Sequence, residues 1–247
     1  MLTLEKQNQL RDRYRLDRPG WRPATEQFAG LVGHYLKSSH SLLDLGCGRG
    51  GLIEQLDHPH SLAIGLDPDM HSLREHRLKM NRAAGYSHEL PFPNEHFDLI
   101  YCSWLLEHLQ SPQADFAEIG RVLKPDGRFL FVTPNVDSPV AVLNRLLGRL
   151  KPVQNLLIKR LYGRESDDAF PTHYRANSEA EILSLLNEIN QNKVGLGSLR
   201  LEALYFVEDP TYLAFLPSFY PFLKAFEKRL PHSRRVHLVG VITKQDL

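Results

Sequence analysis

The chain has 247 residues and a formal net charge of +1, with 30 lysines and arginines against 29 acidic residues. This balance argues against a dedicated nucleic-acid-binding protein, which usually carries a basic excess. No run of about 18 apolar residues is present, so no membrane-spanning helix is expected. The chain has two cysteines, Cys47 and Cys102, so its fold needs no disulfide scaffold, and a reducing compartment is favoured. Because the N-terminus also lacks the apolar core of a secretory signal, we expect a cytoplasmic location.

The predicted elements begin with a helix and then alternate between strands and helices. The first 40 residues are polar and then helical in period, with Phe28, Leu31, Val32 and Tyr35 on one face. Further on, short apolar runs predict strands at 42–45, 62–66, 97–102, 129–133, 199–207 and 236–243. Helical segments are expected at 52–56, 69–83 and 112–123. This alternation is typical of a doubly wound, mainly parallel α/β sheet.

A basic segment, residues 138–164, interrupts the alternation. Two apolar stripes separated by Pro152 predict two short amphipathic helices. The segment contains basic residues and no acidic one: Arg145, Arg149, Lys151, Lys159, Arg160 and Arg164. A later helix is indicated by the capping box Ser178-x-x-Glu181. We therefore expect a single domain over residues 1–247, with an N-terminal helical segment at 1–40 and a helical lid inserted at 138–177.

The strongest functional signal is the segment 42–52, where a buried strand ends in Asp44 and a glycine-rich turn leads into a helix. Glycines at 46, 48 and 50 or 51 allow a tight turn and the close approach of a ligand. They also fit the dinucleotide fingerprint G-x-G-x-x-G. Asp44 argues against that assignment, because a carboxylate at this point would repel the pyrophosphate of NAD. It would instead suit a ligand that carries an ammonium group.

A second acidic position follows at the end of the next strand. Asp67 ends an apolar run about 20 residues after the glycines, where a carboxylate can accept both hydroxyls of a ribose. Asp69 is expected to cap the following helix. Two further blocks complete the pattern, one at 89–102 and one at 123–135. The strand of the first block should bring Ser103 to the same edge of the sheet as the glycine turn.

These four blocks, in this order and spacing, resemble class I S-adenosylmethionine (SAM) dependent methyltransferases. They are most similar to the branch that contains methyltransferases of the ubiquinone and menaquinone pathways. The resemblance covers about residues 40–135 closely and implies a Rossmann-like sheet of seven strands, the last antiparallel, with SAM as the cofactor. The cofactor-binding residues that it implies are Asp44 and Gly46 for the methionine part, the loop residues Cys47, Gly48 and Gly50, Asp67 for the ribose, Pro68 beside it, and Ser103.

One position departs from the family pattern. In many relatives an acidic residue, four positions before a Leu-Pro-Phe turn, accepts a hydrogen bond from the adenine amino group. Tyr86 stands there in this chain and is followed by Ser87. The adenine contact is therefore expected from the backbone at these two residues, or from stacking.

Two histidines are candidates for acid–base catalysis. His108 follows the fourth strand, and His173 lies after the insertion; relatives often place histidines at both points. The alternative for each is a structural, hydrogen-bonding role. Methyl transfer from a sulfonium depends mainly on alignment, so a base is needed only if the acceptor must lose a proton. The histidines show no ligand spacing such as His-x-x-x-His, and no metal is expected.

The sequence thus predicts an enzyme that moves a methyl group from SAM to a small-molecule acceptor, amphiphilic as one option, by in-line displacement. A NAD-dependent oxidoreductase and a SAM-binding protein without turnover are the alternatives. The basic insertion is expected to cover the acceptor. Its charged face is either solvated or in contact with an anionic acceptor or a membrane surface.

Overall fold

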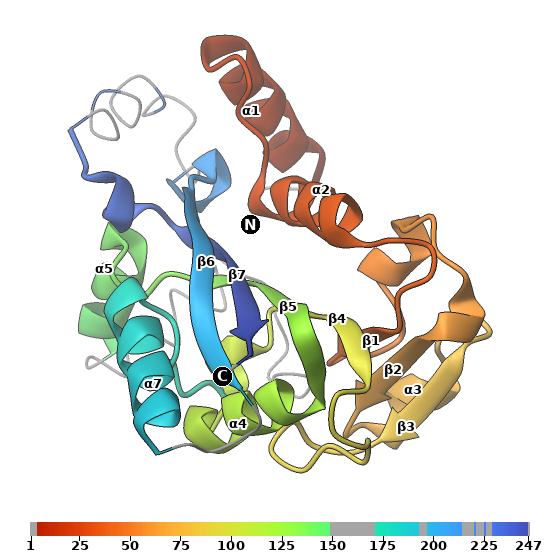
Figure 1. Ribbon diagram of the computed structural model, residues 1–247. Coiled ribbons are helices and arrows are strands. Elements are labelled where there is room, and N and C mark those ends of the chain that lie inside the picture. The colour runs from red at the N-terminus through yellow and green to blue at the C-terminus, as the bar shows by residue number, and fades with distance from the viewer. Residues whose placement is uncertain are drawn as a thin grey trace.

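The computed structural model describes residues 4–148, 171–192, 197–213, 220, 225 and 229–246. Within these residues, seven strands form one sheet in the order β3-β2-β1-β4-β5-β7-β6, which Figure 1 shows across the molecule. The strands are β1 Leu42–Leu45, β2 Ala63–Asp67, β3 Asn81–Ala84, β4 Phe97–Ser103, β5 Leu123–Pro134, β6 Ser198–Val207 and β7 His237–Gln245. The first five are parallel, and β7 pairs antiparallel with β5 and β6. The predicted sheet, with its last strand antiparallel, is confirmed.

Helices cover both faces of this sheet. They are α1 Leu4–Asp17, α2 Ala24–Tyr35, α3 Met70–Arg74, α4 Pro112–Val122, α5 Pro139–Gly148 and α7 Glu179–Gln191. Phe28 and Val32 of α2 pack into the apolar core on one face. Phe116 of α4 and Ile182 of α7 belong to the core on the other face, and Figure 1 shows these helices on the side of the sheet away from α2. Each fully buried side chain of this size contributes roughly 1.5–3 kcal/mol.

Helix α7 begins at the predicted capping box. The Ser178 hydroxyl accepts a hydrogen bond from the Glu181 amide at 3.2 Å. The Glu181 carboxylate reaches back to the amide of Asn177, one residue before the cap, at 2.9 Å. Two of the amides at the helix start are thereby satisfied. The apolar stripe that follows is buried as expected: Ile182, Leu185, Leu186 and Ile189.

Two predicted helices need correction. The helix expected over 69–83 ends at Arg74, and residues 81–84 form the edge strand β3 instead. Most side chains of β3 are exposed, so no apolar run marks it as a strand in the sequence. The helix expected over 52–56 is a single 3₁₀ turn, Leu52–Gln55.

The basic insertion is described only in its first part. Helix α5 lies where the first amphipathic helix is expected, and Arg145 on it is exposed. The second predicted helix and the other five basic residues lie outside the described residues. In the part of the chain that the structure describes, no helix is long and apolar enough to cross a membrane.

Gly240 of β7 faces Phe131 of β5 across the antiparallel pair. A Cβ atom at Gly240 would lie 2.1 Å from Cζ of the Phe131 ring. We expect Gly240→Ala to displace this ring and to lower the free energy of unfolding by ~1–3 kcal/mol, as overpacked cores do. Urea denaturation measures the change. Gly33→Ala in α2 is the control, because no other part of the chain lies within 4 Å of its Cβ position and alanine favours a helix, so its midpoint should not fall. An unchanged midpoint for Gly240→Ala would contradict this packing.

Candidate active site

The glycine-rich loop after β1 is pinned to the end of β2. Gly46, Gly48 and Gly50 have φ values of 78°, 50° and 111°, in the left-handed region that favours glycine. The Gly46 amide donates to the Leu66 carbonyl at 2.8 Å, and the Gly48 amide donates to the Asp67 carboxylate at 2.8 Å. The loop therefore takes its shape from its glycines and its position from β2.

A cavity of about 580 Å³ opens beside this loop at the carboxyl edge of the parallel strands. It is lined by the glycine loop, by Asp44 of β1, by Ser103 and Trp104 at the end of β4, and by α2. The predicted meeting of Asp44 and Ser103 is thus confirmed. Sequence reasoning missed the contribution of α2, whose Phe28 also lines the cavity.

Asp44 is the buried carboxylate among the residues that line this cavity, and only 5% of its surface is exposed. Burial raises its pKa to about 7, and the negative charge of Asp67 adds to the rise. The hydroxyl of Tyr101, its neighbour in β4, partly offsets it. No cationic side chain among the described residues lowers this pKa. A ligand with an ammonium group would supply the missing positive charge, so the residues present fit the amino-acid end of SAM.

Cys47 lies in the loop but is not a nucleophile at neutral pH. Its thiol is buried, and burial raises its pKa to about 12. The sulfur occupies the space beside Gly65, where a Cβ atom would come within 2.7 Å of it. Cys47 and Cys102 are both unoxidised. We conclude that Cys47 shapes the loop by packing.

Asp67, the last residue of β2, and Asp69, just after it, have different roles. The Asp67 carboxylate accepts hydrogen bonds from the amides of Gly48 and Asp69, each at 2.8 Å. Asp69 caps α3 by accepting from the amides of His71 and Ser72, which confirms its predicted role. A carboxylate has about four acceptor positions, so Asp67 retains capacity for ribose hydroxyls. Asp67 does not line the cavity itself, and its ribose contact stays a prediction.

The predicted adenine residues lie in the loop after β3. This loop is held beside β2 because the Gly85 amide donates to the Asp67 carbonyl at 3.3 Å. Tyr86 is 61% exposed and stacks on His88 with 5.4 Å between ring centroids. The Ser87 hydroxyl donates to the carboxylate of Asp115 at 2.5 Å. Pro68 is exposed. The adenine contact stays a prediction.

The chain segments that carry His108 and His173 are joined by contacts to backbone carbonyl groups. The His173 amide donates to the Glu107 carbonyl at 2.7 Å, and Nδ1 of His108 lies 2.9 Å from the Pro171 carbonyl oxygen. The 3₁₀ turn Leu106–His108 after β4 is thus joined to the segment that follows the insertion. Neither histidine lines the Asp44 cavity, and their catalytic role stays a prediction.

Glu107 is a structural residue of this junction. It is buried, and burial raises the pKa of its carboxyl group. Its carboxylate accepts from the Thr133 hydroxyl at 3.1 Å, and the Asn177 amide group donates to that hydroxyl oxygen at 2.6 Å. The network ties the turn after β4 to β5 and to the start of α7. Among the described residues, no cluster of three or more His, Cys, Asp or Glu side chains could hold a metal ion.

Comparison with known proteins shows what the chain around the glycine loop is similar to. The sequence model of the family described as "Methyltransferase domain" matches residues 43–131. An uncharacterised protein of Methanocaldococcus jannaschii is 33% identical over 134 residues, which are 53% of this chain and 51% of that protein. A ubiquinone biosynthesis O-methyltransferase of Salmonella paratyphi A is 30% identical over 122 residues, 45% of this chain and 47% of that protein. The chain spans about half the length of the curated relatives it matches.

Solved structures agree on the fold over nearly the whole chain. The YcgJ protein of Bacillus subtilis superposes with a TM-score of 0.56 at 18% identity and covers 90% of this chain and 99% of its own. A Haloferax volcanii protein described as a "putative methyltransferase", solved in a complex with the Trm112 activator, gives a TM-score of 0.59 at 16% identity, with 96% of this chain and 94% of that chain covered. The seven-stranded fold is therefore one that this chain shares with these solved structures.

Proposed function

Because residues 43–131 match the family described as "Methyltransferase domain", we propose that the protein transfers a methyl group from SAM to a small-molecule acceptor. The observation that carries this proposal is the buried carboxylate of Asp44. It faces a cavity beside the glycine loop and has no cationic partner among the described residues. Bound there, SAM would supply a methyl group activated by its sulfonium.

The residues of the chain bind and align. Asp44 would hold the ammonium group, and the left-handed turn at Gly46 shapes the backbone beside it. Asp67 keeps the loop in place through the Gly48 amide. Phe28 and Trp104 give the cavity apolar walls. Alignment of this kind is worth up to ~7–11 kcal/mol in a displacement reaction. Base catalysis by His108 or His173 is needed only for an acceptor that must lose a proton.

Affinity for SAM should depend on pH through Asp44. In the free protein the pKa of this carboxyl group is about 7, so below that pH it is mostly protonated. An ammonium ligand requires the ionised form, and binding then releases a proton. We expect affinity to rise about tenfold per unit well below pH 7 and to level off above it. Calorimetry between pH 5.5 and 8, in buffers of different protonation enthalpy, measures this release; Asp44→Asn should lose it, and pH-independent binding by the unaltered protein would contradict the assignment.

Transfer itself can be followed with SAM labelled in its methyl group. The protein is incubated with the labelled SAM and the low-molecular-mass fraction of a cell extract, and labelled products are separated. The proposal expects label in a small molecule and little label with Asp44→Asn. Asp57→Asn, which removes an exposed carboxylate, should leave transfer unchanged. Binding of SAM without transfer to any fraction would favour a binding protein without turnover.

A further inference from the structure

A second hollow, of about 300 Å³, shares no lining residue with the Asp44 cavity. Its walls are the turn 18–22 between α1 and α2, the end of β6, and Arg235 just before β7. β6 runs in the same direction as the parallel strands, because both it and β5 are antiparallel to β7. The end of β6 and the start of β7 therefore lie at the carboxyl edge of the sheet, as the Asp44 cavity does.

The turn that forms one wall is fixed to the end of β6. The indole Nε1 of Trp21 donates to the Glu208 carbonyl at 3.1 Å. The Trp21 ring packs edge-on against the buried ring of Tyr14, with 4.7 Å between centroids. Gly20 has a φ of 88°, which lets the chain turn back between the two helices. Trp21 is thus a fixed aromatic wall of the hollow.

The hollow is rich in guanidinium groups. Arg18, Arg22 and Arg235 line it, and Glu208 is the one acidic residue among its described lining residues. Nε of Arg235 lies 3.6 Å from the Glu208 carboxylate, and Nη1 of Arg235 donates to the Phe206 carbonyl at 3.1 Å. The described lining residues thus carry three guanidinium groups against one carboxylate, which is a net positive formal charge. Guanidinium groups match the planar geometry of carboxylate and the oxygens of phosphate.

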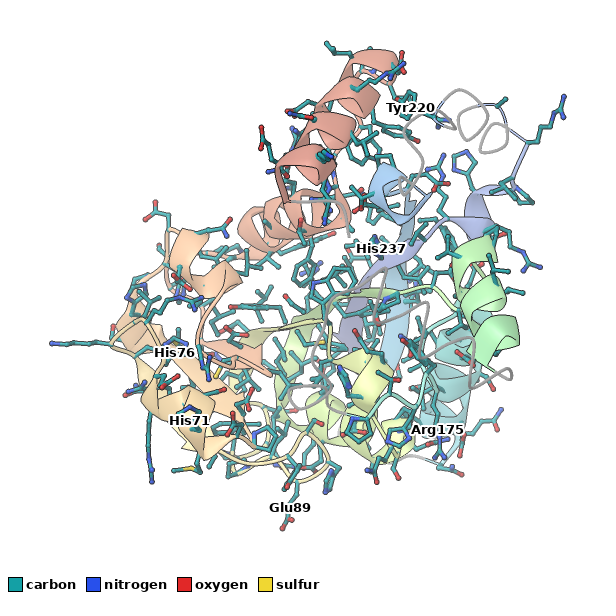
Figure 2. All side chains as sticks on the ribbon, turned by 180° about the vertical axis from the view of Figure 1, so that it is seen from behind. His71, His76, Glu89, Arg175, Tyr220 and His237 are labelled. Atoms are coloured by element: carbon teal, nitrogen blue, oxygen red, sulfur yellow. The ribbon has the colours of Figure 1, made fainter. Side chains whose placement is uncertain are left out.

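One contact links this hollow to the cavity of Asp44. Arg235 lies two positions before His237, the first residue of β7. The ring centroid of His237 lies 5.0 Å from that of Trp104. Trp104 lines the Asp44 cavity. His237 is buried, and Figure 2 shows it in the interior of the molecule. Burial lowers its pKa to about 4, so it adds no positive charge at neutral pH. Two steps along the chain thus separate Arg235 of this hollow from His237, which contacts Trp104 of the other.

We propose that this arginine pocket binds the carboxylate or phosphate group of a small organic anion with a flat apolar body. The guanidinium groups pair with the anion, and the Trp21 ring contacts the body. The further identification of this anion as the methyl acceptor rests on the proposed function. It would explain why the pocket lies at the carboxyl edge and next to the cofactor cavity without sharing residues with it.

The test uses Trp21 as its own reporter. The chain has two tryptophans, so Trp104→Phe leaves Trp21 as the sole source of indole fluorescence. Benzoate, phenyl phosphate and the neutral benzamide are titrated into this protein. We expect saturable changes with both anions and an affinity for benzamide at least about tenfold lower, as for a lost hydrogen bond to a charged group. Arg22→Gln should weaken benzoate binding to a similar extent, whereas Arg200→Gln, at an exposed position of β6, should not.

Equal binding of benzoate and benzamide, or benzoate binding that Arg22→Gln leaves unchanged, would overturn the inference. Calorimetry with SAM on the chain with both tryptophans separates this failure from that of the proposed function. If SAM binds and the pocket shows no preference for anions, the pocket proposal alone is wrong. If the pocket prefers anions and SAM does not bind, the anion site stands and its identification as the acceptor site is wrong.

Discussion

Asp44→Asn is expected to lower the affinity for SAM by at least about 30-fold, because truncating one partner of a buried charge pair costs ~2–5 kcal/mol. The carboxylate is buried, and no cation among the described residues compensates it. Asparagine keeps its size and removes only its charge. Since burial already disfavours the charged form, the substitution should not lower the free energy of unfolding at pH 8.

Calorimetry with SAM measures the loss, and urea denaturation checks the fold. Asp57→Asn is the matched control, because it removes an exposed carboxylate and should bind SAM like the unaltered chain. Adenosine provides a second control, since it lacks the amino-acid part of SAM. Its affinity should be the same with and without Asp44→Asn. Unchanged SAM affinity in Asp44→Asn would show that the carboxylate does not bind the ammonium group.

Asp67→Ala is expected to weaken the binding of both SAM and adenosine, and to do so more strongly than Asp69→Ala. Asp67 fixes the glycine loop through the Gly48 amide and is predicted to accept the ribose hydroxyls. Hydrogen bonds to a charged group contribute ~1.5–3 kcal/mol each. Asp69 caps a helix of five residues, so its loss should cost about 0.5–2 kcal/mol of stability and little binding.

The comparison of adenosine with SAM separates the two carboxylates. Asp44→Asn should affect SAM alone, whereas Asp67→Ala should affect both ligands. If Asp69→Ala weakened adenosine binding as much as Asp67→Ala does, the assignment of the ribose to Asp67 alone would be wrong. The account of the loop after β2 would then be incorrect.

The sequence predicts best the strands that are buried on both faces. β1 and β4 are short, mainly apolar runs with sharp ends, and both lie close to their expected bounds. β3 is an edge strand with mostly exposed side chains, so its sequence carries no such signal. Strand β5 begins at Leu123 and includes Pro125-Asp126-Gly127, ahead of the start expected at residue 129.

The same distinction applies to the site. Asp44 and Ser103 meet because parallel strands end at one edge, which the pattern of strands already implies. The place of Phe28 in the cavity depends on how α2 packs on the sheet, and no local motif encodes it. The meeting of His108 with His173 depends on the chain returning to the Glu107 carbonyl after the insertion. Arg22 and Arg235 are likewise brought together only by tertiary structure.

The central claim is that the Asp44 cavity is a SAM site in a fold that shares its glycine pattern with dinucleotide-binding proteins. Calorimetric titration of the unaltered chain, once with SAM and once with NAD, tests it most directly. We expect saturable binding of SAM at a single site, with release of a proton near pH 6, and no heat of binding with NAD. Binding of NAD without binding of SAM would contradict the claim.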